Sequence, residues 1–201
     1  MRTVIVSNIM SVDGYHEGPG GNVMALNMDA AFDAYNLERF RSAGTVLLGG
    51  TSFQMFSSYW PGIADAPADP DNPALDEVNR EISRVFNALP KVVVSDSYVP
   101  SADNPWYDST TVVKRAEVAD WLTAERQRGS GDFVTFGSRT MWNGLLAQEL
   151  VDELHLMVGP KALGGGTPVF AAPVELRLLG IRRFDGSDNV VLRYAPVTPA
   201  I

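Results

Sequence analysis

Short apolar runs alternate with longer segments of helical spacing along this chain. The runs are rich in β-branched residues and too short for helices, which is typical of buried strands. They occupy residues 4–6, 45–48, 91–94, 110–113 and 133–136. Between them, apolar residues three or four positions apart predict helices with one stripe facing a core. We expect these helices over 30–41, just after Ser52, over 73–89, over 115–128 and from Thr140 through Leu146.

Glycine and proline indicate where several of these elements begin and end. Gly44 is placed to end the first helix and Gly129 to end the helix over 115–128. Pro73 is suited to be the first residue of the helix that it precedes, because its missing N–H is not needed there. Residues 11–21 contain four glycines and one proline, so we expect a loop there.

The C-terminal part of the chain predicts strands without intervening helices. Residues 150–158 alternate in part, and residues 176–194 read as a hairpin with its turn at 185–188. Strands that alternate with helices predict a mainly parallel sheet covered on both faces. We therefore expect one α/β domain over residues 1–201: a three-layer α/β/α fold with a mixed, mainly parallel central sheet and a C-terminal antiparallel hairpin.

Composition and charge exclude several functional classes. The chain has no cysteine, which excludes disulfides, cysteine nucleophiles and thiolate metal sites, and its two histidines disfavour a multi-histidine metal site. A formal net charge of −8 disfavours a general nucleic-acid or anionic-membrane surface. No segment has the roughly 20 apolar residues of a membrane span. The N-terminus reads as a strand and not as a signal peptide, so we expect a cytoplasmic protein. From the cysteine and histidine counts we expect no metal site.

Three predicted strand ends carry residues that suit a nucleotide. The turns are Gly49-Gly50-Thr51, Ser95-Asp96-Ser97 and Gly137-Ser138-Arg139-Thr140. Ligands of open α/β sheets bind beyond the carboxyl ends of strands, where helix N-termini favour phosphates and glycine allows close approach. The alternative is that each glycine only makes a tight turn. Neither a G-x-G-x-x-G fingerprint nor a P-loop is present.

The order of motifs resembles a known family. Ser11-Val12-Asp13-Gly14 follows the first strand, and residues 47–53, Leu-Leu-Gly-Gly-Thr-Ser-Phe, follow the second. The most specific stretch runs from Phe136-Gly137-Ser138 through Leu150-Val151-Asp152-Glu153-Leu154 to the segment 160–170, Pro-Lys-Ala-Leu-Gly-Gly-Gly-Thr-Pro-Val-Phe. Over residues 3–194 the chain resembles the dihydrofolate-reductase-like family. The closer resemblance is to the branch related to the C-terminal reductase domain of bacterial bifunctional riboflavin biosynthesis proteins.

This resemblance implies an NADPH-dependent reductase, often a homodimer, that transfers hydride to a C=N or C=O group of a small heterocyclic or ribosylaminopyrimidine-like substrate. It implies that Gly49, Gly50 and Thr51 line one phosphate and that Ser95, Asp96 and Ser97 lie near the adenosine ribose. It also implies that Gly137, Ser138, Arg139 and Thr140 hold the pyrophosphate, and that Asp13 and Gly14 lie beside the nicotinamide and the substrate.

Two positions depart from the family pattern. Its members usually have a basic residue where this chain has Gly50, and often one where it has Asp96. A carboxylate near the ribose favours a free 2′-hydroxyl and repels a 2′-phosphate. We therefore expect a weakened preference for NADPH, so that NADH binds comparably, unless Arg139 supplies the missing charge.

The reaction also needs a proton donor. A carboxyl group can serve if burial raises its pKa, and Asp13 is the first candidate. Asp33, on the first helix, is the second, although an ordinary solvated role is the simpler interpretation. His16 lies in the same loop as Asp13 and can contact the substrate. Two other hypotheses stay open: a non-catalytic nucleotide-binding or interaction protein with this fold, and a deazaflavin-dependent reductase.

Overall fold

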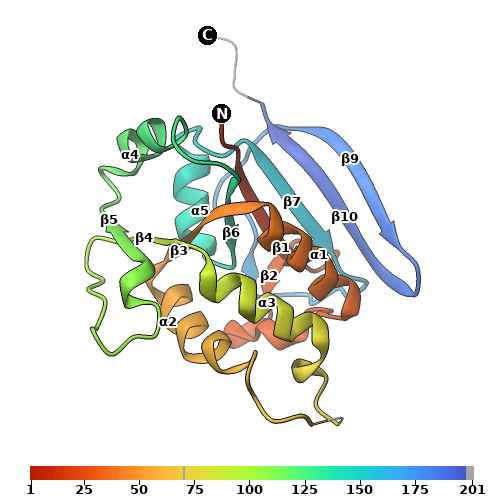
Figure 1. Ribbon diagram of the computed structural model, residues 1–201. Helices are drawn as coiled ribbons and strands as arrows, with labels where there is room; N and C mark the ends of the chain where they lie inside the picture. Colours follow the sequence, from red (N-terminus) through yellow and green to blue (C-terminus); the bar gives the residue numbers. More distant parts are fainter. Residues whose placement is uncertain (70, 198–201) are drawn as a thin grey trace. The chain divides into compact units, whose positions relative to one another are not determined.

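The computed structural model describes residues 1–69 and 71–197, which form two compact units. Unit 1 contains residues 1–2 and 33–134, and unit 2 contains residues 3–32 and the chain from residue 135 onward. Figure 1 shows the helices and strands in chain order. Helix α1 (Ala30–Ser42) leads from unit 2 into unit 1, and strand β6 (Asp132–Phe136) leads back. The prediction of a single domain stays a prediction.

Unit 1 is built on parallel strands in the order β5-β4-β3-β6. The predicted strands and helices of this region are all present. The elements besides β6 are β3 (Ala43–Gly49), α2 (Gly50–Tyr59), α3 (Glu77–Ala88), β4 (Lys91–Val94), β5 (Thr110–Val113) and α4 (Val118–Glu125). Short 3-10 turns lie at Trp60–Gly62, Pro73–Leu75 and Tyr107–Ser109.

Helix α3 begins later than Pro73. Residues 73–75 form a separate 3-10 turn, and the α-helix starts at Glu77. The reason is Asp76, whose carboxylate accepts a hydrogen bond of 2.8 Å from the backbone N–H of Asn79. An N-cap carboxylate satisfies an N–H group that the helix itself leaves without a partner. The prediction that Pro73 starts the helix is therefore wrong.

The prediction that Gly44 ends helix α1 is wrong, because this residue lies inside β3. A Cβ atom at this position would overlap the carbonyl oxygen of Ser130. A Cβ on Gly131 would in turn lie 2.6 Å from the backbone nitrogen of Gly44. The glycines are therefore required because the two backbone segments approach each other closely.

A lysine lies in the core of unit 1. Lys91 begins β4 and is only 1% exposed. Its ammonium donates to the carbonyl of Asn87 at 2.8 Å and to the hydroxyl of Ser109 at 3.4 Å, and it lies 4.5 Å from the ring centre of Trp106. Burial lowers the pKa of Lys91 to about 7, because removal from water disfavours the charged form.

Unit 2 is built on strands in the order β1-β7-β10-β9. Strands β1 and β7 are parallel, and β10 is antiparallel to both β7 and β9. A second, small sheet pairs β2 with β8, which the sequence does not predict. The elements are β1 (Val4–Met10), β2 (Tyr15–Glu17), α5 (Arg139–Leu146), β7 (Glu153–Val158), β8 (Thr167–Pro168), β9 (Leu176–Phe184) and β10 (Ser187–Pro196).

The turn of the C-terminal hairpin is attached to the start of helix α1. Asp29 caps α1 by accepting from the N–H groups of Ala31 and Phe32 at 3.0 and 3.2 Å. The same carboxylate accepts from the Ser187 hydroxyl at 2.6 Å and from the amide of the fully buried Asn189 at 2.9 Å. Burial opposes the charge on Asp29, but these hydrogen bonds outweigh it and lower its pKa.

The predicted fold class is confirmed. The strands form a mixed, mainly parallel set of eight with a C-terminal antiparallel pair, accompanied by helices in a three-layer α/β/α arrangement. The hairpin turn is shorter than predicted, since β9 ends at Phe184 and β10 begins at Ser187. Within the residues that the structure describes, no helix is long and apolar enough to cross a membrane.

Candidate functional site

The first predicted turn starts a helix beside the end of a neighbouring strand. Gly49 is the N-cap of α2, and no side chain caps this helix. A Cβ atom on Gly50 would lie 3.3 Å from Cβ of Tyr98 and 3.6 Å from Oγ of Ser95. Unit 1 thus brings two of the three predicted turns together. A Cβ at position 50 would make a tight contact with Tyr98, which the glycine avoids.

The Ser95 turn is ordered by its own side chains. The Ser95 hydroxyl accepts from the N–H groups of Ser97 and Tyr98 at 3.4 and 3.1 Å. The carboxylate of Asp96 accepts from the backbone N–H of Arg115 at 3.0 Å, and the Arg115 guanidinium lies 3.7 Å from it. The anionic Asp96 of this turn therefore has a cationic neighbour, Arg115, from the segment after β5.

Sequence reasoning missed Arg115. It follows β5, which lies parallel to β4 with Val113 opposite Val94. The signal was the basic pair Lys114-Arg115 directly after a predicted strand that neighbours the Ser95 turn. The same parallel-sheet rule that grouped the three turns would have added this fourth strand end.

The third turn belongs to unit 2 and has left-handed backbone. Gly137 and Ser138 have φ of 55° and 51°, and helix α5 follows without a side-chain cap. The Asn8 amide donates to the carbonyl of Gly137 at 3.2 Å. A serine in this conformation is uncommon and is held only where its surroundings fix it. The first turn of α5 presents backbone N–H groups that have no acceptor within the helix.

Arg139 is engaged by the segment that contains β8. Its guanidinium donates to the carbonyl of Pro168, and to that of Phe170 at 3.3 Å. Asn143, one turn later, donates to the carbonyl of Val169 at 3.1 Å and accepts from the N–H of Ala171 at 2.8 Å. Arg139 therefore attaches α5 to this segment, and its guanidinium already has hydrogen-bond partners within the protein.

Asp13 holds together two loops of unit 2. Its carboxylate accepts from the Ser11 hydroxyl at 2.6 Å and from the N–H groups of Leu163 and Gly164 at 3.0 and 2.7 Å. These bonds lower the pKa of Asp13 to about 2, with the Ser11 bond the largest cause. The expectation that burial raises this pKa is wrong, because Asp13 is exposed and accepts three hydrogen bonds as a carboxylate.

Gly14 and His16 lie between these loops and β8. Gly14 has φ of 85°, and its carbonyl accepts from the N–H of Val169 at 2.9 Å. His16 lies on β2, half-buried, and among the described residues its Nδ1 atom is buried without a hydrogen-bond partner. Burial lowers the pKa of His16, and the charge of Arg139 lowers it further against the opposing charge of Glu17. His16 and Arg139 are thus close enough to interact.

The remaining candidate residues lie at the three turns and on helix α1. Thr51, Ser97 and Thr140 are exposed at the three turns. Asp33, the second proton-donor candidate, lies in unit 1 and accepts from the amide of Asn79 at 3.2 Å. Where the chain is described, no group of three or more metal-ligating side chains occurs.

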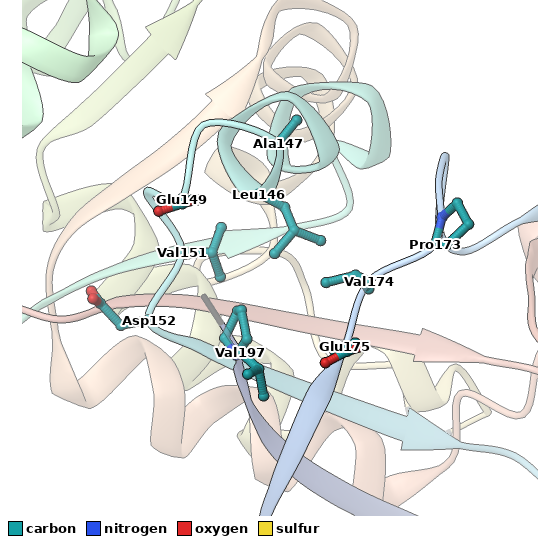
Figure 2. Close-up of a pocket in the computed structure, with 10 residues that line it drawn as sticks. Leu146, Ala147, Glu149, Val151, Asp152, Pro173, Val174, Glu175 and Val197 are labelled. Atoms are coloured by element: carbon teal, nitrogen blue, oxygen red, sulfur yellow. The ribbon is translucent and has the colours of Figure 1, made fainter. Parts of the chain in front are cut away.

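A cavity of about 570 Å³ in unit 2 contains none of the predicted residues. Figure 2 shows Leu146, Val151 and Val174 directed toward one another in it. Leu146 ends α5, whereas the Gly137 turn begins that helix, so the cavity is at the opposite end of α5 from the predicted phosphate turn. It is therefore not the predicted cofactor site.

Comparison with known proteins gives a match over most of the chain. The model of the RibD C-terminal domain matches residues 2–190. The uncharacterised protein YyaP of Bacillus subtilis (strain 168) is 24% identical over 193 residues, covering 94% of this chain and 92% of that protein.

Solved structures with a similar fold include two reductases. One is a diaminohydroxyphosphoribosylaminopyrimidine deaminase/5-amino-6-(5-phosphoribosylamino)uracil reductase from Thermotoga maritima, with a TM-score of 0.63 and 13% identity. The match covers 98% of this chain but only 57% of that protein. The other is dihydrofolate reductase from Enterococcus faecalis complexed with NADP(H), with a TM-score of 0.56, 11% identity and 96% of each chain covered. The fold is therefore dihydrofolate-reductase-like, and the chain belongs to the RibD C-terminal domain family.

Proposed function

We propose that this chain is an NAD(P)H-dependent reductase that transfers a hydride to a small heterocyclic or ribosylaminopyrimidine-like substrate. Family membership and the reductases with the same fold support a reductase. The observation that carries the cofactor assignment is the position of Gly50 at the start of α2, within van der Waals reach of the Ser95 turn. The cytoplasmic location and the homodimer predicted above belong to the same proposal.

The residues of unit 1 fit the adenosine end of a nicotinamide dinucleotide. An uncapped helix start with two glycines favours a phosphate group through backbone N–H groups and the helix dipole. Asp96 can accept from a ribose 2′-hydroxyl, and Arg115 can pair with a 2′-phosphate. Because the Arg115 guanidinium lies 3.7 Å from the Asp96 carboxylate, we propose that NADH and NADPH both bind, with Asp96 and Arg115 acting in opposite directions.

The residues of unit 2 fit a phosphate group and the substrate. We propose that the Gly137 turn binds a phosphate through the first turn of α5, and that the Asp13 loops contact the substrate. When bound, the reduced nicotinamide supplies a hydride, and the substrate must gain a proton as well. Asp13 is ionised at neutral pH and is a positioning residue in this proposal. Asp33, which accepts a hydrogen bond from the amide of Asn79, is the other proton-donor candidate.

Cofactor titration by tryptophan fluorescence tests the proposal. We expect Gly50→Val to raise the dissociation constants of NADH and NADPH at least tenfold, since the new side chain overlaps the space next to Tyr98 and Ser95. Gly62→Val is the matched control, because a Cβ at Gly62 meets no atom within 4 Å. Equal effects of the two substitutions would contradict the proposed site.

Hydride transfer is then followed as loss of reduced-nicotinamide absorbance with a panel of aminopyrimidines and pterins. Asp33→Asn should lower turnover at saturating cofactor far more than Asp13→Asn if Asp33 provides the proton. Binding of a dinucleotide without turnover of any substrate would favour the non-catalytic hypothesis. Failure to bind NADH or NADPH, together with binding of a deazaflavin, would favour a deazaflavin-dependent reductase.

A further inference from the structure

The cavity of Figure 2 has apolar walls from four segments of unit 2, and we call it the α5 cavity. The segments are the end of α5, the loop 149–152, residues 173–175 and residues 196–197 at the end of β10. Val151 is only 5% exposed, and the half-buried side chains of Leu146 and Val174 are directed toward it. A volume of about 570 Å³ with mostly apolar walls is typical of a site for a small molecule.

Backbone hydrogen bonds join these segments, so the α5 cavity is preformed. The N–H of Leu150 donates to the carbonyl of Leu145 at 3.0 Å, which holds the loop against the helix. The N–H of Val197 donates to the carbonyl of Glu175 at 2.9 Å, which joins the end of β10 to the segment before β9. A preformed site has little conformational entropy left to lose when a ligand binds.

The charges around the α5 cavity have one sign. Among the described residues, the charged side chains that line it are the carboxylates of Glu149, Asp152 and Glu175. Asp152 is held in place by the backbone N–H of Val4, from which it accepts at 2.7 Å. Glu149 and Glu175 are exposed, and their carboxylates make no hydrogen bond or ion pair with any described residue. These two groups are therefore available to a ligand.

The end of helix α5 adds to this negative potential. Helix α5 ends at Leu146, and both Leu146 and Ala147 line the cavity. The C-terminal end of a helix carries a partial negative charge, which favours cations near the last turn. The last turn of α5 has no basic residue of its own, so the helix does not neutralise this charge.

A ligand with a positive charge and an apolar body fits both properties of the cavity. Its ammonium would form charge-assisted hydrogen bonds with the carboxylates, and its apolar body would cover Val151. A neutral ligand of the same shape gains only the apolar part, and an anion is repelled by all three carboxylates. The cavity thus favours a charge opposite to that of a phosphate, which the other end of α5 suits.

We propose that the α5 cavity binds a small organic cation, an amine whose apolar body lies against Val151 and whose ammonium pairs with Glu149 and Glu175. None of the residues proposed to bind the cofactor or the substrate lines this cavity. The inference therefore goes beyond the proposed function and does not depend on it.

NMR titration of the full, ¹⁵N-labelled chain with 4-phenylbutylamine as the probe tests the site at pH 7, where an alkyl amine is protonated. The neutral 4-phenylbutanol and the anionic 4-phenylbutyrate have the same apolar body and serve as matched ligands. We expect the amine to shift the backbone N–H signals of 146–152 and 174–175. We also expect it to bind at least five times more tightly than the alcohol, and the carboxylate not to bind.

Substitutions separate the charge from the apolar contact. The double variant Glu149→Gln and Glu175→Gln should weaken binding of the amine at least fivefold and leave binding of the alcohol unchanged. Asp185→Asn is the control, because it removes an exposed carboxylate of the same unit outside the cavity. Val174→Arg should abolish binding of the amine, since its own guanidinium occupies the cavity. The spectra themselves show whether each variant is folded.

Three results would each overturn the proposal. They are the absence of shifts at 146–152 and 174–175 at millimolar amine, equal affinities for the amine and the alcohol, and unchanged affinity in the double glutamine variant. Titration of the same samples with NADH tests the proposed function separately, because neither ligand needs the residues of the other.

Discussion

The buried ammonium of Lys91 makes the stability of the protein depend on pH in a specific direction. In the unfolded chain a lysine has a pKa of about 10.4, whereas burial lowers that of folded Lys91 to about 7. Between these values the unfolded state binds more protons, so stability rises with pH. Below pH 7 both states are charged and the cost of burying the charge is complete.

The magnitude follows from the surroundings of the ammonium. At 1.36 kcal/mol per pKa unit, the full difference corresponds to an upper limit of about 4 to 5 kcal/mol. The carbonyl of Asn87 and the face of Trp106 stabilise the charged form, and a cation–π contact contributes about 0.5 to 2 kcal/mol. We therefore expect a change of about 1 to 2 kcal/mol between pH 6.5 and 9.5.

Urea unfolding followed by tryptophan fluorescence measures this change in the chain and in Lys91→Met, whose unbranched side chain is one atom shorter and has no charge. The free energy of unfolding of the unsubstituted chain should rise relative to that of Lys91→Met as the pH increases. Lys161→Met, at an exposed lysine, should not alter the slope. Parallel pH profiles for the chain and Lys91→Met would refute the reasoning.

Four further substitutions test other contacts. Asp29→Ala should destabilise the chain by about 2 kcal/mol, because it removes a helix cap and the bonds to Ser187 and Asn189. This loss of stability should become smaller in acid, as the pH falls to the lowered pKa of Asp29. Chemical unfolding measures both effects, with Asp188→Ala as the exposed control. Asp13→Ala should speed hydrogen exchange at the N–H groups of Leu163 and Gly164, and unchanged exchange would show that the carboxylate does not hold this loop. Asp96→Asn should shift the ratio of dissociation constants toward NADPH and Arg115→Gln toward NADH; a ratio that moves the same way in both variants would contradict the opposing roles.

The sequence predicts the fold well because the signals are local. The β-branched runs at 45–48 and 91–94 and the stripe of α3 each identify their element without knowledge of any neighbour. The errors concern contacts distant in sequence. Position 44 must be a glycine because the carbonyl of Ser130 leaves no room for a Cβ atom. In the sequence, such a glycine looks the same as one that ends a helix.

The candidate site is predictable only in part, for the same reason. The parallel-sheet rule correctly placed Gly50 beside the Ser95 turn. The ionisation of Asp13 was not predictable, because it depends on the N–H groups of Leu163 and Gly164, about 150 positions away along the chain. The engagement of Arg139 by the carbonyls of Pro168 and Phe170 is likewise a property of the folded chain.

The extra residue Leu179 of β9 shows how a strand takes up an insertion without changing which side chains share a face. Gly180 lies opposite Arg193 and Leu178 lies opposite Tyr194, so Leu179 has no partner of its own in the ladder. Deleting it would leave Leu176 and Leu178 on the same side of the hairpin as Ile181, because the remaining residues would alternate regularly. A gap of one residue at this point of an alignment is therefore compatible with an unchanged arrangement of the hairpin side chains.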